Sequence, residues 1–457
     1  MNELKILIFL VGFSFYGNIL CGQSDSLMLA KIHEHTLIKG QSYSNLEELC
    51  KNIGHRLTAS PQSYKAIEWG KKKLDELKLD SVWLQPITVP HWVRGDIERL
   101  DFSNKNTPIH VSHCTALGGS IGTNGKVISG QVIEIKNWDE LDSKTEKEIK
   151  GKVVFFNQPM NPALINTFRA YGGCAGYRMY GSMKAAEKGV SAVIIRSLTL
   201  KNDENPHTGM MKYVDSIAKI PGVAISSKDA YILSNMIKED PNTSIKLKLS
   251  CQILPDTVSY NVIGELRGSE KPEEIILVGG HLDSWDIGEG AHDDGAGVVQ
   301  SLETIRTFQM LQIKPKHTIR CVLYMNEENG NMGGKGYAKY ASEYHEKHLF
   351  ALETDRGGFS PRGFSIDGTE EQLKFIQDFE ELFAPYWIHL FEKGHGGVDI
   401  GPLKDGKVCL VGLMPDTQRY FDFHHAKSDV LENVNERELK LGSAAITSLI
   451  YLIDRHW

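Results

Sequence analysis

Imidazole and carboxylate side chains follow three successive apolar segments in the second half of the chain. In chain order they are His281, Asp283, Glu327, Glu328 and Asp355. Each apolar segment has the length and composition of a buried strand. In open α/β sheets, ligands bind outside the carboxyl ends of the strands. We therefore expect these side chains to gather in one crevice.

Two further clusters could contribute to the same crevice. Asp293 and Asp294 precede an expected helix, and the segment Phe423–Asp429 contains His424 and His425. Many like charges in one crevice are costly unless cations neutralise them. Oxygen and nitrogen ligands without thiolate suit zinc in a hydrolytic site, although manganese or cobalt could use the same ligands. The combined pattern predicts a metal centre.

Each of these features also has a purely structural interpretation. Asp293-Asp294 could cap the helix that follows. Glu327-Glu328 could be solvated loop charges, and His424-His425 could be surface imidazoles. Taken singly, the structural interpretation is the more frequent one. The metal centre is favoured because ligand-type side chains end three successive strands.

The elements that would position these residues alternate regularly from Tyr260 onward. Expected strands lie at residues 275–278, 318–325 and 349–353, with helices at 295–310 and 332–345. Such alternation predicts an α/β fold with a mixed, largely parallel central sheet between helices. The stretch from about 95 to 255 differs, with short strands, a helix at 179–188 and no acid, base or metal cluster. It is interpreted as a non-catalytic insert.

Four sequence runs together resemble the co-catalytic zinc exopeptidases, peptidase family M28. They are GGHLDSWDIGEGAHDDGAG, MNEENGNMGGKGY, ETDRGG and FHHAKSDV. The similarity extends over nearly the whole chain, including GHGGVDIGPL at Gly394–Leu403. The resemblance implies the zinc exopeptidase fold, with a protease-associated, β-rich domain inserted into it.

The resemblance also implies a site with two Zn²⁺ ions per chain. Asp293 would bridge the metals, one of which would also bind His281 and Asp355. The other would bind Glu328 and His425. His425 is preferred over His424 because the family pattern has an acidic residue four positions after the ligand. That acidic residue is Asp429 here.

Catalytic roles follow from the same resemblance. Two metals about 3.5–4 Å apart can share a water and lower its pKa. Glu327 would accept the proton of this bridging water as the general base and later deliver it to the leaving amine. Asp283 would orient His281, and Asp429 would orient His425. The implied activity is that of a carboxypeptidase or dipeptidase acting on unblocked dipeptides and short peptides.

Three alternatives remain within the same fold. An aminopeptidase acting on longer peptides would share every metal ligand. A glutaminyl cyclase would use a single zinc, and the filled bridging and second-metal positions argue against it. A catalytically silent, receptor-like protein would lack ligands that are all present here.

The length and the N-terminus define an expected domain organisation. A chain of 457 residues exceeds one ordinary domain. Lys5 followed by the apolar run 6–16 is typical of a secretory signal and is too short to span a bilayer. The expected segments are a signal peptide at 1–22, a propeptide or N-terminal arm at 23–43, the first part of the catalytic domain at 44–115, the insert at 116–254, and the catalytic di-zinc domain at 255–457.

Composition sets the expected environment and partners. The net charge of −7 and the lack of a long basic block argue against nucleic acid as a partner, and no membrane anchor is expected. The seven cysteines form no C-x-x-C pair, so a cysteine-ligated zinc is not indicated. A sequon at Asn242 fits an extracellular or lysosomal glycoprotein. A homodimer is implied by the resemblance alone.

Overall fold

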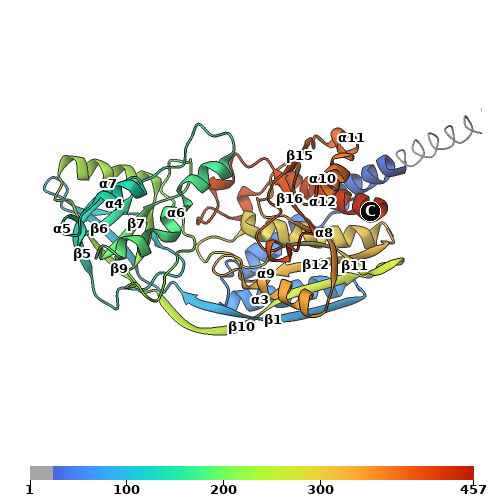
Figure 1. Cartoon of the computed structure of the whole chain (residues 1–457), viewed down its shortest axis with the longest axis horizontal. Coiled ribbons are helices and arrows are strands. Elements are labelled where there is room, and N and C mark those ends of the chain that lie inside the picture. The colour runs from blue at the N-terminus through green and yellow to red at the C-terminus, as the bar shows by residue number, and fades with distance from the viewer. Residues whose placement is uncertain (1–23) are drawn as a thin grey trace, which may run out of the picture.

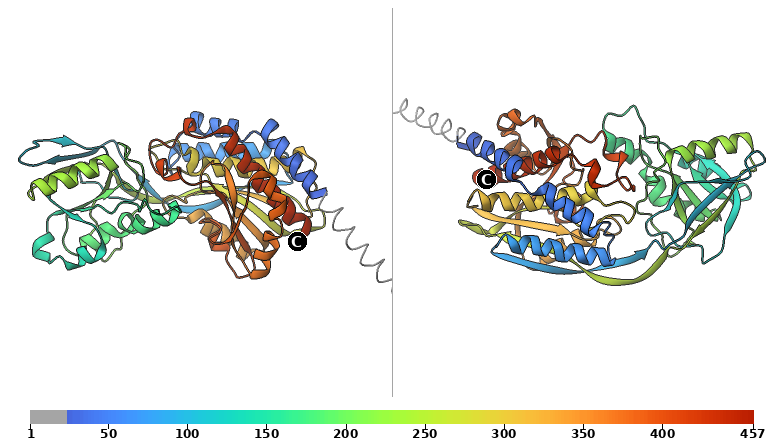
Figure 2. Two further views of the ribbon diagram at one scale, coloured as in Figure 1. Left: turned by 90° about the horizontal axis from the view of Figure 1, so that it is seen from above. Right: turned by 180° about the vertical axis from the view of Figure 1, so that it is seen from behind.

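The computed structural model describes residues 24–457, so the expected signal peptide at 1–22 lies outside the described residues. Two eight-stranded sheets organise the chain and lie at opposite ends of its long axis (Figure 1). Two long antiparallel strands, β1 (Ser81–Val93) and β10 (Gln252–Leu266), lead from one unit to the other. Two further views show the same separation of the two units (Figure 2).

The first sheet carries the strands that end in ligand-type residues. Its parallel centre is formed by β12, β11, β13 and β16, whereas the pairs β1–β10, β10–β12 and β14–β16 are antiparallel. This is the mixed, largely parallel sheet that the sequence predicted. Beyond β1 and β10, the strands in spatial order are β12 (His317–Tyr324), β11 (Lys271–His281), β13 (Lys347–Glu353), β16 (Cys409–Pro415), β14 (Pro361–Asp367) and β15 (Leu390–Lys393).

Helices bury both faces of this sheet. In β11, Ile276 and Val278 point into one core, and Ile275 and Leu277 point into another on the opposite face. A strand buried on both faces is apolar without alternation, which explains its sequence pattern. One face is covered by α3 (Pro61–Glu76), α8 (Ala296–Met310) and α12 (Glu436–His456), and the other by α9 (Met332–Glu343).

Shorter helices complete this unit. They are α2 (Ser42–Glu47), α10 (Glu370–Gln377), α11 (Glu380–Phe383) and the turns η1 (Glu48–Ile53), η2 (Ala291–Gly295), η3 (Ala384–Tyr386), η4 (Gly401–Leu403), η5 (Tyr420–Asp422) and η6 (Leu431–Asn433). The segment expected as a propeptide or N-terminal arm, 23–43, packs on the first unit over its described part. Residues 24–39 are helical, and Leu29 and Ile32 are fully buried in the main core.

The second sheet belongs to the unit between β1 and β10. Its strands in spatial order are β3 (His110–Val111), β2 (Glu98–Ser103), β9 (Ser244–Leu249), β5 (Ile128–Ile135), β6 (Val153–Phe156), β7 (Ala192–Arg196), β8 (Gly222–Ile225) and β4 (Cys114–Ala116). The sheet thus starts at Glu98, ahead of the expected boundary at 116. The reason is that β2 pairs with β9, far along the chain, which local sequence does not reveal.

Four helices accompany the second sheet, which therefore carries more helix than a β-rich domain suggests. They are α4 (Trp138–Ser143), α5 (Glu146–Ile149), α6 (Thr167–Ala186) and α7 (Ser227–Glu239). Helix α6 begins twelve residues before the expected helix at 179–188. Gly172, Gly173 and Gly176 lower its intrinsic helix propensity, which concealed its first turns. Cys174 and neighbouring residues hold these turns by packing against Phe421 and Phe423.

Two further properties concern the described residues alone. No helix between residues 24 and 457 combines the length and apolarity that crossing a bilayer requires. The cysteines of this range are all free thiols: Cys50, Cys114, Cys174, Cys251, Cys321 and Cys409.

Candidate metal centre

Three neighbouring parallel strands bring the predicted ligands to one edge of the first sheet. β11 lies between β12 and β13, so the segments that follow these three strands start side by side. His281 is the last residue of β11. Glu328 follows β12, and Asp355 follows β13 by two residues. Asp293 lies in η2, between β11 and α8.

Asp293 lies between two groups of ligand-type atoms. On one side, His281 Nε2 is 3.2 Å from Asp293 Oδ1 and 3.6 Å from Asp355 Oδ1. On the other side, His425 Nε2 is 3.3 Å from Asp293 Oδ2 and 3.0 Å from Glu328 Oε2. The five predicted ligands therefore form two groups that share one carboxylate.

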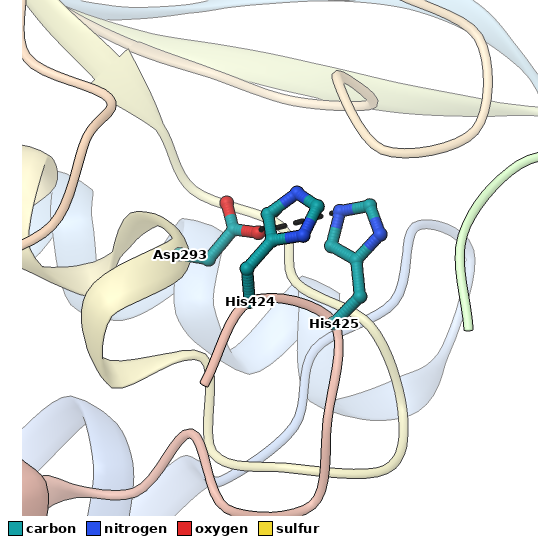
Figure 3. Close-up of side chains that lie close together, drawn as sticks. All are labelled: Asp293, His424 and His425. Atoms are coloured by element: carbon teal, nitrogen blue, oxygen red, sulfur yellow. Dashed lines mark ion pairs between the residues drawn. The ribbon is translucent and has the colours of Figure 1, made fainter. Parts of the chain in front are cut away.

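His424 approaches the same carboxylate. Its Nε2 is 3.8 Å from Asp293 Oδ2, and its ring stacks on that of His425 at 3.6 Å between centroids (Figure 3). Both histidines lie on the loop between η5 and η6. The arrangement favours His425 as the ligand, because His425 alone of the two also contacts Glu328.

Several atoms that could bind a metal in this centre lack the hydrogen-bond partners that buried polar atoms normally have. Four buried atoms have no hydrogen-bond partner among the described residues: His281 Nε2, Asp293 Oδ2, Glu328 Oε1 and Asp355 Oδ1. Leaving such atoms unpaired is costly, and native proteins seldom do so. Each atom belongs to a predicted ligand and is of a type that binds zinc. The centre therefore fits divalent cations.

The pKa values in the centre are shifted because several buried carboxyl groups lie close together. Burial raises the pKa of Glu328 well above its usual range, and the nearby Asp293 raises it further. Burial and Asp293 likewise raise the pKa of Asp355. Burial by itself would lower the pKa of His281, but Asp293 and Asp355 hold it well above the usual value. Burial lowers the pKa of His425, which keeps that ring neutral and able to bind metal.

Glu327 lies beside the centre without belonging to either group. Its carboxylate accepts no hydrogen bond from the described residues, while its backbone N–H donates to Asp283 Oδ1 at 3.1 Å. Burial, reinforced by Asp355 and Asp293, raises the pKa of Glu327 to about 8. Bound cations would favour the carboxylate form and lower this value. The side chain is thus free to exchange a proton close to the metal ligands.

Asp283 does more than orient an imidazole. Asp283 holds His281 through its backbone carbonyl, 3.0 Å from Nδ1. Its carboxylate accepts backbone N–H groups from Asn326 at 2.7 Å, Glu327 at 3.1 Å and Glu328 at 3.3 Å. Asp283 therefore fixes the loop that carries the predicted base and one ligand.

The expectation that Asp429 orients His425 is not met. The Asp429 carboxylate instead accepts the backbone N–H groups of His292 at 2.7 Å and Asp293 at 3.1 Å. Asp429 lies four positions after His425, but the intervening turn aims the Asp429 side chain at η2. Asp429 thus fixes the backbone of the shared carboxylate.

The inserted unit supplies the contact that orients His425. Thr208 N–H donates to the His425 carbonyl at 2.9 Å, and the Thr208 carbonyl is 3.3 Å from His425 Nδ1. A proton on Nδ1 would let it donate to this carbonyl and would leave Nε2 free as a ligand, whereas Arg178 Nη1, 3.3 Å from the same Nδ1, can donate only to an unprotonated Nδ1. Arg178 Nη1 donates to the same carbonyl at 3.4 Å. Sequence reasoning missed both residues, because they lie more than 200 positions from His425.

Arg56 is a third residue that sequence reasoning missed. It is fully buried in the first unit. Its guanidinium donates to the carbonyls of Leu282 at 2.5 Å, Glu289 at 2.6 Å and Gly290 at 2.9 Å. Arg56 therefore secures the loop between His281 and Asp293.

Replacing Gly209 by alanine should disturb the centre from the inserted unit. A Cβ at this position would lie 2.5 Å from the Arg178 guanidinium and 2.6 Å from His425 Nδ1, and the φ of +131° disfavours a side chain. Loss of a group that orients a ligand typically costs 10–100-fold in metal affinity or activity. We expect Gly209→Ala to lower metal affinity by about that factor, as measured by titration of the metal-free protein.

Gly172→Ala is the matched control, since it adds a methyl to the same unit where nothing lies within 4 Å. It should leave metal affinity unchanged. Equal affinities for Gly209→Ala and the wild type would show that the inserted unit does not position His425.

The chain is similar to known proteins. The model of peptidase family M28 matches residues 261–450. Carboxypeptidase Q from Xenopus laevis is 34% identical over 92% of this chain and 87% of its own. Carboxypeptidase Q from Homo sapiens is 33% identical over 91% of this chain and 85% of its own.

Solved structures agree with the sequence comparisons. The crystal structure of a peptidase M28 precursor from Shewanella amazonensis superposes with a TM-score of 0.90 at 32% identity, covering 95% of this chain and 97% of its own. A zinc aminopeptidase from Bacillus subtilis shares the fold, with a TM-score of 0.65 at 20% identity over 90% of this chain and 94% of its own. The chain therefore belongs to peptidase family M28, is homologous to carboxypeptidase Q, and is a metallo-exopeptidase.

Proposed function

We propose that this protein is a secreted carboxypeptidase or dipeptidase with two zinc ions, which hydrolyses unblocked dipeptides and short peptides. The observation that carries the proposal is the pair of ligand groups joined by Asp293. Four of their buried atoms, one each from His281, Asp293, Glu328 and Asp355, have no hydrogen-bond partner among residues 24–457. In this proposal His281 and Asp355 hold one ion, and Glu328 and His425 hold the other. Asp293, whose two carboxylate oxygens face different histidines, would serve both positions.

When bound, the two ions supply Lewis acidity that polarises the scissile carbonyl and acidifies a water. Glu327 accepts the proton of that water and transfers it to the nitrogen of the leaving amine. The Glu327 carboxylate has no hydrogen-bond partner among the described residues. It can therefore turn from the water to the nitrogen of the leaving amine. Asp283 keeps the Glu327 backbone in place throughout.

The inserted unit restricts which substrates reach the centre. Thr208 and Arg178 of this unit lie directly against His425. Among the described residues, the insert at 116–254 contributes no side chain to either group of metal-ligand residues. A centre bordered in this way suits short peptides better than folded proteins. The homology to carboxypeptidase Q supports a carboxypeptidase or dipeptidase over an aminopeptidase acting on longer peptides.

Metal analysis and a hydrolysis screen test this function together. We expect two divalent metal ions per chain by elemental analysis, and hydrolysis of free dipeptides that stops after chelation and returns with zinc. N-blocked dipeptides should be poor substrates. Unchanged activity after exhaustive chelation would refute the proposal, and a preference for long peptides with release of the N-terminal residue would replace it by the aminopeptidase.

The cellular setting is proposed on other grounds. Entry into the secretory pathway rests on the signal-like pattern of residues 1–22, and an extracellular or lysosomal destination follows from it. Asn242 of the sequon is exposed in a turn before β9, where a glycan could be attached. A homodimer is proposed from the family resemblance.

A further inference from the structure

The loop 282–290 joins two of the predicted ligands, His281 and Asp293, and reaches into the inserted unit. Its Trp285 is buried in the hydrophobic core of that unit. The indole packs directly on the backbone of Gly118, where an added Cβ would lie 1.8 Å from the ring. A loop of the first unit that connects two ligands is therefore embedded in the second unit.

Arg94 binds the same loop from the other side of the junction. It is the first residue after β1 and is buried where the chain enters the inserted unit. Its Nε donates to Asp286 Oδ2 at 3.0 Å, and its Nη2 donates to Asp286 Oδ1 at 2.5 Å. This is the planar, two-pronged contact that guanidinium groups make with carboxylates, and it fixes both distance and orientation.

The remaining donors of Arg94 bind the inserted unit. Nη1 donates to Glu98 Oε1 at 2.9 Å and to the Ala116 carbonyl at 2.7 Å. Nη2 also donates to Thr208 Oγ1 at 3.5 Å. Thr208 is the residue whose backbone contacts His425. One guanidinium thus contacts both the loop between two ligands and the residue that holds a third.

The surrounding charges explain why arginine suits this position. The side chains of Asp286 and Glu98 are only 14% and 20% exposed, so their negative charges are poorly screened without a cation between them. Burial by itself would lower the pKa of Arg94, but Asp286 and Glu98 hold it above the usual value, so the guanidinium stays charged. A lysine would keep the charge but lacks the planar fork.

We propose that Arg94 is a positioning residue for the metal centre, which sets the placement of His425 relative to Asp293 by holding Thr208 and Asp286 together. The inference rests on the proposed two-metal function and adds the residue through which the inserted unit acts on it. The group of Glu328 and His425 should depend on Arg94 most, because Thr208 contacts His425. His281 is held by the Asp283 carbonyl within the first unit.

Zinc titration of the metal-free protein, followed by calorimetry, measures the two binding steps. Contacts that orient a metal ligand typically contribute 10–100-fold in affinity, so Arg94→Gln should raise the dissociation constant of one step by about that factor. The other step should stay close to wild type, because His281 and Asp355 both belong to the first unit. Arg94→Lys should recover part of the loss.

Two further measurements separate positioning from a general loss of stability. Cobalt-saturated Arg94→Gln should show an altered visible absorption spectrum, because this spectrum reports the geometry around the ion and not the stability of the fold. Asp286→Asn removes the charge from one contact and leaves Arg94 bound to Glu98, so it should weaken the same zinc step by a smaller factor. The double variant should bind zinc no more weakly than Arg94→Gln alone, because both changes break one contact.

Arg99→Gln is the matched control, since Arg99 is an exposed arginine of the same unit that pairs with Asp101 at 3.0 Å. It should keep both zinc steps and the cobalt spectrum. A folded Arg94→Gln variant with wild-type zinc affinities and cobalt spectrum would overturn the inference and leave the two-metal function intact. If that variant does not fold, unchanged zinc binding by Asp286→Asn overturns the inference instead. Wild-type protein that binds no zinc would refute the proposed function itself.

Discussion

Glu327→Gln should retain its metal and lose its turnover. The substitution keeps the size of the side chain and removes the proton acceptor. General acid–base catalysis contributes about 10²–10⁴-fold, so kcat should fall by that factor. KM should change little, because the two ligand groups remain. Steady-state kinetics on a dipeptide, with elemental analysis of the same sample, measures both properties.

The variant should also fold normally. The Glu327 carboxylate accepts no hydrogen bond from the described residues, so nothing is left unpaired by the change. The fold raises the pKa of Glu327 to about 8, which means that it disfavours the ionised form. Above the unfolded pKa near 4.5 this group therefore costs stability. Metal-free Glu327→Gln should be at least as stable as metal-free wild type at pH 7, as measured by thermal unfolding.

Glu328→Gln is the matched control, being the same substitution at the adjacent position. Glu328 Oε2 lies 3.0 Å from His425 Nε2, so this variant should lose metal from the second group. If Glu327→Gln lost metal and Glu328→Gln kept it, the two roles would have to be exchanged. Near-normal turnover of Glu327→Gln with full metal content would refute its role as the base.

Asp293→Ala should empty both metal positions. The two oxygens of Asp293 face different histidines, His281 at 3.2 Å and His425 at 3.3 Å. Removing the carboxylate therefore weakens both groups at once and leaves no shared ligand. Elemental analysis should fall from two ions toward none, and hydrolysis should drop to background.

Thermal unfolding provides a second measurement for this variant. A ligand at one hundred times its dissociation constant stabilises the folded state by about 2.7 kcal/mol per site. Zinc should thus raise the Tm of metal-free wild type but not that of Asp293→Ala. Asp378→Ala, an exposed aspartate paired with Lys374, should respond like wild type. Retention of one ion by Asp293→Ala would assign Asp293 to a single metal instead of to both.

The sequence was most informative where apolar segments of strand length are followed directly by ligand-type residues. Strands ending near His281, Glu327 and Asp355 could be predicted because buried parallel strands are apolar throughout and then end abruptly in ligand-type residues. The rule that strand ends share one edge then placed these residues together before any distance was known. Helices with a clear apolar side, such as α8, were located for the same reason.

Local patterns failed where packing outweighs propensity. Residues 24–39 are polar and weakly patterned, yet they form a helix that buries Leu29 and Ile32 in the core. The first turns of α6 contain several glycines, but they are secured by aromatic residues from the loop that carries His424 and His425. Tertiary contacts routinely override such weak local preferences.

By itself, the sequence determined the family, the α/β fold class and a set of five ligand-type residues with an adjacent glutamate, the proposed base. Those features depend on residue types and short spacings, which the chain displays directly. The tertiary structure alone decided that Asp429 fixes Asp293 instead of His425, and that Thr208 of the inserted unit orients His425. It also decided that Arg94 contacts both Asp286 and Thr208. These contacts join residues that are distant in the sequence or turned by local backbone geometry, and no spacing along the chain encodes where such side chains meet.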